Sequence, residues 1–330
     1  MEEISERLSE RNIETSQRTQ TKGIHAALAS ALFLGFTPVF GKLAIQYGLP
    51  PLTVVALRTL FAASLLFILV LVLNRSYLYI YPAGLIGCLL AGGINGIGSI
   101  FFYVSLGRID ASLGQIIFSL YPLFVAVWLW LDRQPPSRLT IIRLLLVIPA
   151  LLLLTHTSQA KIDLLGVVFM LVAGAMYALH LPINQRVLYE MPAPTVTFYT
   201  LLAMSLVVVP TLFFSGLSTP VANQAWWALG GLTLVTFISR LTLFLGVKHL
   251  GGMQTAMLGL TELLITISFS HILLHERLNL YQWMGLGLLA FILFLVRYEK
   301  PAPTRTGAGG WLSWLVPPQI PSKFPWQPHD

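Results

Sequence analysis

The chain has 330 residues, of which 56% are hydrophobic and only 10% are charged. An average soluble domain carries about 25% charged residues, so this composition excludes an ordinary soluble protein and indicates a chain embedded in lipid. The net charge of +7 does not indicate nucleic-acid binding, because the basic residues are spread over tails and loop ends without a patch or an aromatic platform. The single cysteine, Cys88, excludes an internal disulfide and a cysteine metal cluster.

Both ends of the chain read as tails. Residues 1–22 are polar and mixed in charge, without the apolar core and cleavage site of a signal peptide, so we expect a solvated cytoplasmic tail. Residues 299–330 are rich in Pro and Gly, which predicts a second, irregular cytoplasmic tail. Trp311, Trp314 and Leu315 suggest an alternative for this segment, contact with the inner membrane surface.

Between the tails, apolar windows of roughly 20 residues, the length that crosses a hydrocarbon core, recur along the chain. Bounded by Pro, Gly and charge, they predict ten transmembrane helices in an all-α polytopic membrane protein. The short connections after Arg108 and Lys248 predict tight antiparallel hairpins. The expected helices cover residues 24–47, 52–73, 82–107, 111–131, 138–155, 163–188, 194–215, 224–248, 253–275 and 279–297.

Two stretches of similar sequence, LRTLFAASL from Leu57 and FYTLLAMSL from Phe198, lie at an offset of 141 residues. The same offset relates FYVSLGRI to LFLGVKHL, and a constant offset across several segments indicates an internal repeat. We predict two five-helix repeats, residues 23–156 and 162–298.

Five is an odd number of helices, so the second repeat must enter the membrane from the side opposite to the first. With the N-terminus inside, both tails and most basic connections lie inside, as the positive-inside rule favours. The inside residues are Arg75, Arg133, Arg138, Arg143, Arg186 and Lys248, and the outside ones are Arg108, Lys161 and Arg277. Inverted repeats of kinked helices around a midplane site are typical of secondary transporters.

Three stretches also carry a family resemblance: LGFTPVFGKLAI in the first expected helix, SLYPLFVAVWLWLDR in the fourth and TELLITISFSHILLHER in the ninth. With the five-plus-five plan, they resemble the EamA family of the drug/metabolite transporter superfamily over residues 24–298. The resemblance implies a transporter in a bacterial inner membrane that exports an amino acid or a similar small metabolite. The ninth helix departs from the family pattern, because Glu262-Leu263 stands where the family usually has Glu-Pro.

Three charged residues, Arg58, Arg240 and Glu262, lie deep within the expected spans. Charged side chains at that depth are costly and generally face the bundle interior or a cavity. The turn near Leu250 brings Glu262 and Arg240 to one depth on adjoining helices. Two interpretations stay open: a buried ion pair with Arg240 that fixes helix packing, or a carboxylate that faces a cavity and exchanges protons or holds a substrate amine.

Thr255, Gly259, Glu262 and Thr266 follow one another at intervals of four, three and four, which places them in one stripe of the ninth helix. The stripe predicts that Thr255 and Thr266 lie with Glu262 along a substrate or proton pathway. Close packing against a neighbouring helix is the alternative, because small residues serve this purpose in membranes.

The repeat offset sets Tyr121-Pro122 opposite Glu262-Leu263, so we expect Tyr121 to face Glu262 across the centre. Pro122 removes a backbone donor at mid-depth and is the expected gating element. Asn95, within AGGINGIGS, is a further candidate for the pathway.

Two basic side chains are open to a simpler explanation. Arg58 either snorkels to the inside surface or binds a substrate carboxylate. Lys42 is expected to snorkel near the outer end of the first helix.

The sequence offers no support for an enzyme. It has neither the Gly-x-Ser-x-Gly elbow of serine hydrolases nor a phosphate-binding Gly-x-x-x-x-Gly-Lys loop, so we expect no cofactor and transport driven by an ion gradient or by the gradient of the solute. His271, His275 and Glu276 invite a metal site, but the metalloprotease motif and repeated histidine boxes are missing, and we predict no metal.

The expected partners are a small-molecule solute, the lipid bilayer and protons as the coupling ion, with a homodimer left open. A non-transporting membrane scaffold and an intramembrane enzyme are the alternatives to a transporter.

Overall fold

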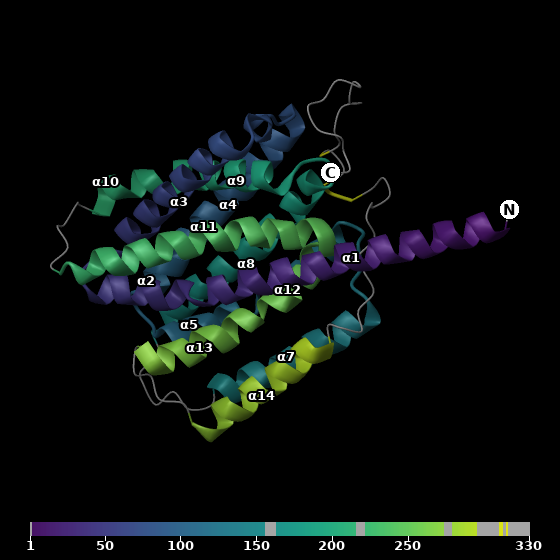
Figure 1. Ribbon diagram of the computed structural model, residues 1–330. Coiled ribbons are helices and arrows are strands. Elements are labelled where there is room, and N and C mark those ends of the chain that lie inside the picture. The colour runs from purple at the N-terminus through teal and green to yellow at the C-terminus, as the bar shows by residue number, and fades with distance from the viewer. Residues whose placement is uncertain are drawn as a thin grey trace.

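The computed structural model describes residues 2–155, 163–215, 222–273, 279–295, 310–312 and 315. Within these ranges the regular elements are helices that pack side by side as a bundle (Figure 1). The helices are α1 Glu2–Gly35, α2 Thr37–Gln46, α3 Pro51–Leu73, η1 Arg75–Leu78, α4 Pro82–Leu106, α5 Ala111–Phe118, α6 Tyr121–Leu131, α7 Arg138–Thr155, α8 Leu164–Leu188, α9 Ala193–Val208, η2 Val209–Thr211, α10 Leu212–Ser215, α11 Gln224–Leu250, α12 Gly252–Gly259, α13 Thr261–Leu273 and α14 Leu280–Phe294.

The prediction of an all-α, multi-pass membrane protein is confirmed. In the described ranges, eight stretches of helix are long and apolar enough to cross a membrane, and Trp283–Phe294 is a shorter apolar helix. The fifth and tenth expected spans correspond to α7 and α14, which adjoin residues outside these ranges and are not among the eight. The number ten therefore stays a proposal.

Four of the expected continuous helices are interrupted, three of them by residues outside any helix and the seventh by the 3-10 turn η2 between α9 and α10. The first is divided into α1 and α2 at Phe36, the fourth into α5 and α6 at Ser119 and Leu120, and the ninth into α12 and α13 at Leu260. Pro38 and Pro122 follow the first two breaks and cannot donate a backbone hydrogen bond there. The third break forms without a proline.

The polar N-terminal segment continues the first helix, because α1 begins at Glu2 and projects well beyond the bundle (Figure 1). The short connections are as expected. Gly251 alone joins α11 to α12, and its φ of 83° is in the left-handed region that glycine adopts without steric strain.

Two basic residues make contacts that the sequence did not predict. Lys42 Nζ donates hydrogen bonds of 2.8 Å to the carbonyl oxygens of Leu106, at the end of α4, and of Ile109, in the turn that follows. Arg143, expected at a connection, is buried in α7.

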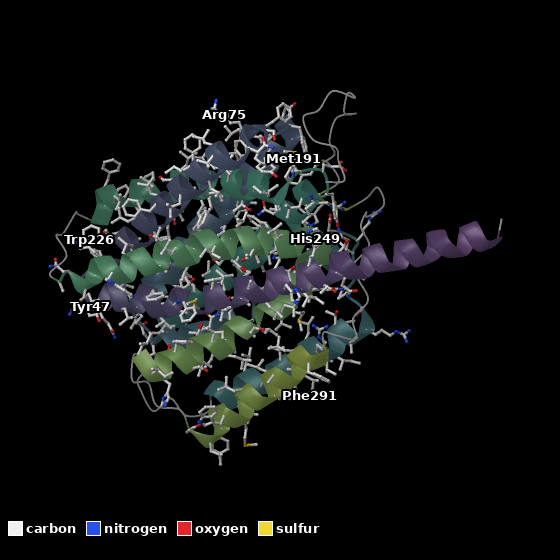
Figure 2. All side chains as sticks on the ribbon, viewed as in Figure 1. Tyr47, Arg75, Met191, Trp226, His249 and Phe291 are labelled. Carbon is white, nitrogen blue, oxygen red and sulfur yellow. The ribbon has the colours of Figure 1, made fainter. Side chains whose placement is uncertain are left out.

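The outer surface of the bundle is apolar. Large hydrophobic side chains such as Trp226 and Phe291 are exposed there (Figure 2), as a surface in contact with lipid requires. Inside, α4 packs against α8 and α9, α1 packs against α11, and α7 and α14 form a pair along one side (Figure 1).

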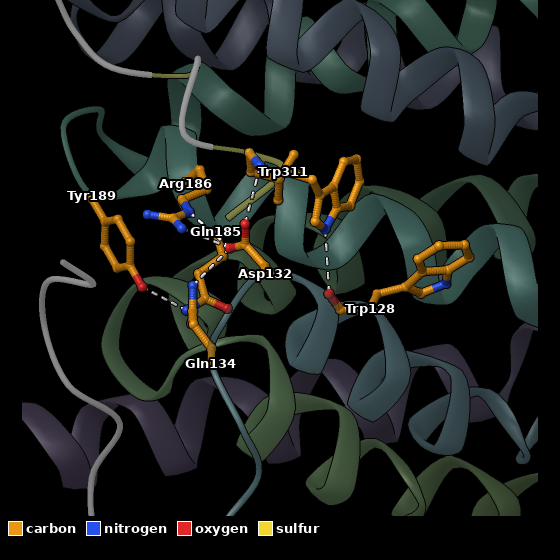
Figure 3. Close-up of polar contacts among 8 residues, drawn as sticks. Trp128, Asp132, Gln134, Gln185, Arg186, Tyr189 and Trp311 are labelled. Carbon is orange, nitrogen blue, oxygen red and sulfur yellow. Dashed lines mark hydrogen bonds and ion pairs between the residues drawn. The ribbon is translucent and has the colours of Figure 1, made fainter. Parts of the chain in front are cut away.

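One end of the bundle is held by a buried ion pair. The carboxylate of Asp132, just after α6, accepts hydrogen bonds from Arg186 Nε and Nη2 at 3.1 and 2.8 Å, and from Gln134 and the backbone of Leu312 (Figure 3). The Asp132 side chain is fully buried. Arg186 closes α8, so the pair ties the end of α6 to the end of α8.

Part of the C-terminal tail is ordered on this end. Trp311 donates from Nε1 to the carbonyl oxygen of Trp128 (Figure 3), and Leu312 and Leu315 are buried with Ala91 of α4. The alternative in which Leu315 contacts the membrane surface is therefore wrong, because its side chain packs into the bundle. Trp314 lies outside the described residues.

Candidate functional site

A cavity lies where the interrupted helices meet. Residues from all three breaks line it: Thr37 and Pro38 from the first, Gln115 and Phe118 from the second, and Glu262 from the third. Irregular backbone at membrane depth is tolerated where it is buried in protein or lines a cavity. The breaks and the cavity therefore belong together.

Tyr121 connects two of these breaks. Its hydroxyl donates a hydrogen bond of 3.0 Å to the carbonyl oxygen of Ala256 in α12. That carbonyl lacks its usual helical donor, because the N–H of Leu260 bonds to Met257 instead. Tyr121 thus satisfies a polar group that the break in the ninth expected helix releases.

Gly259 makes this contact feasible. A side chain at position 259 would occupy the place of the Tyr121 hydroxyl, and its Cβ would lie 3.2 Å from Glu262 Oε1. The Tyr121 ring also packs edge-on against Tyr177 at 4.9 Å and against Phe118 at 5.5 Å between centroids. Tyr121 therefore lies behind the aromatic wall of the cavity, close to Glu262, while Pro122 is buried in the same turn of α6.

Arg58 of α3 points into the cavity and does not snorkel. It is 3% exposed, and its Nη1 and Nη2 donate to the hydroxyls of Thr236 at 3.1 Å and Ser99 at 3.4 Å. Its Cζ lies 4.7 Å from the centroid of the Tyr103 ring, a cation-π distance. Of the two interpretations of Arg58, the one in which it reaches the inside surface is wrong, because hydroxyls and a ring face from α4 and α11 hold it at the cavity.

Arg240 of α11 lies at the same cavity and is held by aromatic and imidazole groups. Its Cζ is 5.5 Å from the centroid of the Tyr177 ring, and its Nη1 is 3.5 Å from His180 Nε2. His180 is fully buried, and its Nδ1 contacts the carbonyl oxygen of Tyr177. Because a carbonyl oxygen can only accept, Nδ1 carries the hydrogen and Nε2 is left to accept from Arg240.

Glu262 occupies the first turn of α13 and is 4% exposed. The free N–H groups and the dipole at the start of a helix favour a negative charge in this position. Among the residues that the structure describes, Glu262 and Arg240 line one cavity but do not form an ion pair within 4 Å. The geometry therefore places the carboxylate at the cavity without a direct cationic partner.

The other predicted site residues separate into two groups. Asn95 of α4 lines the cavity, with its Nδ2 3.5 Å from the sulfur of Met204. Thr255 and Thr266 are buried but do not line it: their hydroxyls donate to the carbonyl oxygens of Gly251 at 2.9 Å and Gly35 at 2.7 Å. The stripe on the ninth expected helix thus splits, and its threonines bond to backbone while Glu262 faces the cavity.

Sequence reasoning missed Gln115, Ser99 and His180. Gln115 is 2% exposed and lines the cavity beside the Glu262 carboxylate. A signal was available, since an amide within ASLGQIIF and an imidazole within YALHLPI are polar groups at membrane depth.

A metal site is not found among the described residues, where no group of three or more His, Cys, Asp or Glu side chains gathers. Of the residues considered for one, His271 is described, whereas His275 and Glu276 lie outside the described ranges.

The comparison with known protein families decides the identity of this membrane protein. The model of the EamA-like transporter family matches residues 21–156 and 164–298, most of the chain. The chain belongs to the EamA-like transporter family. The resemblance seen in the sequence is confirmed, and because this is a family of transporters and not of enzymes, the EamA-like protein is a multi-pass membrane transporter.

Two curated bacterial proteins are similar to this EamA-like transporter. "Uncharacterized transporter YcbK" of Bacillus subtilis (strain 168) is 23% identical over 209 residues, which cover 60% of this chain and 67% of the relative. "Uncharacterized transporter sll1319" of Synechocystis sp. (strain ATCC 27184 / PCC 6803 / Kazusa) is 26% identical over 220 residues, 62% of this chain and 64% of the relative. The match thus spans slightly less than two thirds of the second relative.

A solved crystal structure supports the fold independently. It aligns with a TM-score of 0.64 at 14% sequence identity and covers 84% of this chain and 98% of the other. At this identity the likeness shows a shared fold alone.

Proposed function

We propose that this EamA-family transporter is a secondary active exporter of amino acids or similar small metabolites, which works by alternating access around the central cavity. The observation that carries the proposal is the cavity itself, in which Arg58, Arg240 and Glu262 stand together inside a membrane protein. Charged groups at membrane depth are retained where they bind a solute or ions. Asn95 completes the proposed substrate and proton pathway.

Two inverted five-helix repeats, residues 23–156 and 162–298, and ten spans are part of this proposal. Its support is the position of two helix breaks: Ser119, between α5 and α6, and Leu260, between α12 and α13, are separated by the 141 residues of the sequence repeat. Two ion pairs at opposite ends of α8 support an odd number of crossings in the first half. Arg108, after α4, pairs with Asp163 before α8 at 2.8 Å, so α8 begins on the side where α4 ends. Asp132, after α6, pairs with Arg186 near the end of α8, so α8 ends on the side where α6 ends.

The proposed gate is the contact between the two broken helices. Tyr121 and Pro122 begin α6, and the Tyr121 hydroxyl holds the Ala256 carbonyl beside the break of α12 and α13. If the halves rock about the centre, this bond must break or move. Thr255 bonds to the start of its own helix α12, and Thr266 bonds to Gly35 of α1, so both would serve helix packing in that motion instead of binding solute.

Glu262 is the proposed proton carrier, since it faces the cavity without a direct ion pair and can change charge as the cavity opens to either side. Both termini are proposed to be cytoplasmic in a bacterial plasma membrane. The export direction rests on the family resemblance.

Transport by the purified full chain in liposomes tests the proposal. We expect at least one labelled solute from a panel of amino acids and small metabolites to accumulate, with a rate that depends on an imposed pH gradient. Protein-free liposomes are the control. Failure to move any solute of the panel, with or without the gradient, would contradict secondary transport.

A further inference from the structure

The charged groups of the cavity do not balance. Two guanidinium groups, Arg58 and Arg240, line it together with one carboxylate, Glu262, and every other lining residue in the described part of the chain is uncharged. With all three groups ionised, the wall carries a formal charge of +1, since two positive charges face one negative charge. Buried charges are normally paired, because an unpaired one is costly outside water.

The two guanidinium groups also lie close together. Arg58 Nη1 bonds to the Thr236 hydroxyl at 3.1 Å, and Thr236 is one helical turn before Arg240 on the same face of α11. Both heads are therefore held at neighbouring positions along α11.

The partners that hold these heads supply no negative charge. Arg58 bonds to the hydroxyls of Thr236 and Ser99, and Arg240 contacts an imidazole, His180, whose Nε2 accepts in the neutral tautomer. The Nε atoms of both arginines are buried without a hydrogen-bond partner. A planar guanidinium with free donors matches a carboxylate better than any other common group.

The rest of the wall is suited to an apolar body. Phe102 and Phe118 pack edge to face at 5.3 Å between ring centroids, and Phe118 contacts Tyr177 at 5.1 Å. All three line the cavity. Gln115 lines the cavity beside Glu262 and adds an uncharged amide to the wall.

We propose, building on the transport function above, that this cavity binds its solute as an organic anion, a monocarboxylate with an apolar or aromatic body and a net charge of −1. The carboxylate lies between Arg58 and Arg240, and the body lies against the ring wall. A zwitterionic amino acid leaves the excess positive charge in place, and an amine increases it. The site therefore prefers the carboxylate over the amino acid with the same skeleton.

Matched compounds that share an apolar body and carry a carboxylate, an amino group or both test this preference. One set is 3-phenylpropionate, phenylalanine and 2-phenylethylamine, and a second is 4-methylpentanoate, leucine and 3-methylbutylamine. Binding to the purified full chain is measured by calorimetry and by the shift of its unfolding temperature, and movement by counterflow in liposomes. In each set we expect the carboxylate to bind at least tenfold more tightly than the amino acid, and the amine to bind most weakly.

Substitutions of the two arginines test whether Arg58 and Arg240 bind the carboxylate of the solute. Arg58→Gln and Arg240→Gln should each weaken carboxylate binding at least tenfold, and Arg58→Lys should retain part of it. Arg108→Gln is the matched control, because Arg108 is exposed and pairs with Asp163 far from the cavity lining, and it should leave binding unchanged. If the glutamine variants do not fold, the order of the binding affinities of the carboxylate, the amino acid and the amine for the unmodified chain tests the anion preference by itself.

The outcomes separate the two proposals. Equal or tighter binding of the amino acid or the amine, no binding of either carboxylate, or full carboxylate binding by folded Arg58→Gln and Arg240→Gln would overturn the anion preference. If the amino acid or the amine binds as tightly as the carboxylate or more tightly, and the amino acid moves in liposomes, the anion preference is wrong but the transport function is retained. Lack of movement of any solute contradicts the transport function itself.

Discussion

The hydroxyl of Tyr121, in the first turn of α6, donates a 3.0 Å hydrogen bond to the carbonyl oxygen of Ala256 in α12. This bond joins two interrupted helices that lie at corresponding positions of the two family matches. The hydroxyl fits only because position 259 carries no side chain. The bond is therefore a point where a small change in the sequence should disturb the centre of the transporter.

Gly259→Ala is expected to displace the Tyr121 hydroxyl, because the new Cβ would occupy its place. The loss strands the Ala256 carbonyl in the interior, which costs roughly 1–3 kcal/mol of unfolding free energy. Thermal unfolding in detergent measures the effect. Gly230→Ala is the control, since a Cβ there meets open space, and helix propensity alone should stabilise the protein by about 0.5–1 kcal/mol.

Tyr121→Phe should suppress the effect of Gly259→Ala, because it removes the atom with which the new Cβ collides. The two changes are therefore expected to be non-additive by about 0.5–3 kcal/mol in a double-mutant cycle. Strict additivity would mean that Tyr121 and Gly259 do not contact each other in the folded protein.

Glu262→Gln is expected to abolish pH-driven flux while solute exchange without a gradient remains, because the amide keeps the shape of the carboxyl group but cannot carry a proton. The stability should fall by less than the roughly 3–5 kcal/mol that breaking a direct buried ion pair costs, since Arg240 is not within ion-pair distance. Flux under a pH gradient and thermal unfolding measure the two effects. Asp163→Asn removes a carboxylate outside the cavity and should retain coupled flux. A folded Glu262→Gln protein with full coupling would exclude the proton-carrier role.

Arg186→Gln is expected to destabilise the fold by roughly 3–5 kcal/mol, because it leaves the fully buried Asp132 carboxylate without its cation. The contrast is Arg108→Gln, whose ion pair with Asp163 is 42% and 33% exposed and should matter far less. Unfolding temperatures of the two variants in one detergent give the comparison. Equal shifts would mean that burial of the Asp132 pair does not contribute to its strength.

Asp163 should contribute to the stability of the fold in a pH-dependent way. Its hydrogen bond from Arg108, and then the backbone N–H of Gly166, hold the pKa of Asp163 below its usual range. A lowered pKa in the folded state stabilises the fold above the ordinary aspartate range, about pH 4, and the contribution is lost as the pH falls through the folded pKa. Asn retains the helix cap without the charge. We expect the protein to be more stable than Asp163→Asn at pH 6, with the gap closing on acidification, and a gap that widens would contradict this sign.

Much of the fold could be predicted from local patterns. The expected windows coincide with the helices within a few residues in most cases, because apolar length and bounding Pro or Gly are local properties. The breaks were harder to predict. Pro122 indicates one of them, but α12 and α13 separate beside Gly259 with Leu263 in place of a proline, where the Tyr121 hydroxyl bonds to the Ala256 carbonyl.

The candidate site could be predicted only in part. Arg58, Arg240, Glu262 and Asn95 stand out because a polar group is rare in an apolar helix, and all four line the cavity. Their partners could not be inferred. The hydroxyls of Thr236 and Ser99 hold Arg58, whereas the hydroxyl of Thr233, also on α11, bonds to the carbonyl oxygen of Leu229 in its own helix.

The sequence by itself determined that the chain lies in a membrane, where its helices run, and which charged groups are deep, because hydrocarbon leaves the backbone few other solutions and makes each buried charge conspicuous. The tertiary structure alone decided which of those groups meet. These helices are apolar on all sides, so periodicity does not indicate which face points inward. Only packing turned Arg58 toward the cavity, brought the Thr266 hydroxyl to the carbonyl oxygen of Gly35 in α1, and left Glu262 at the cavity apart from Arg240.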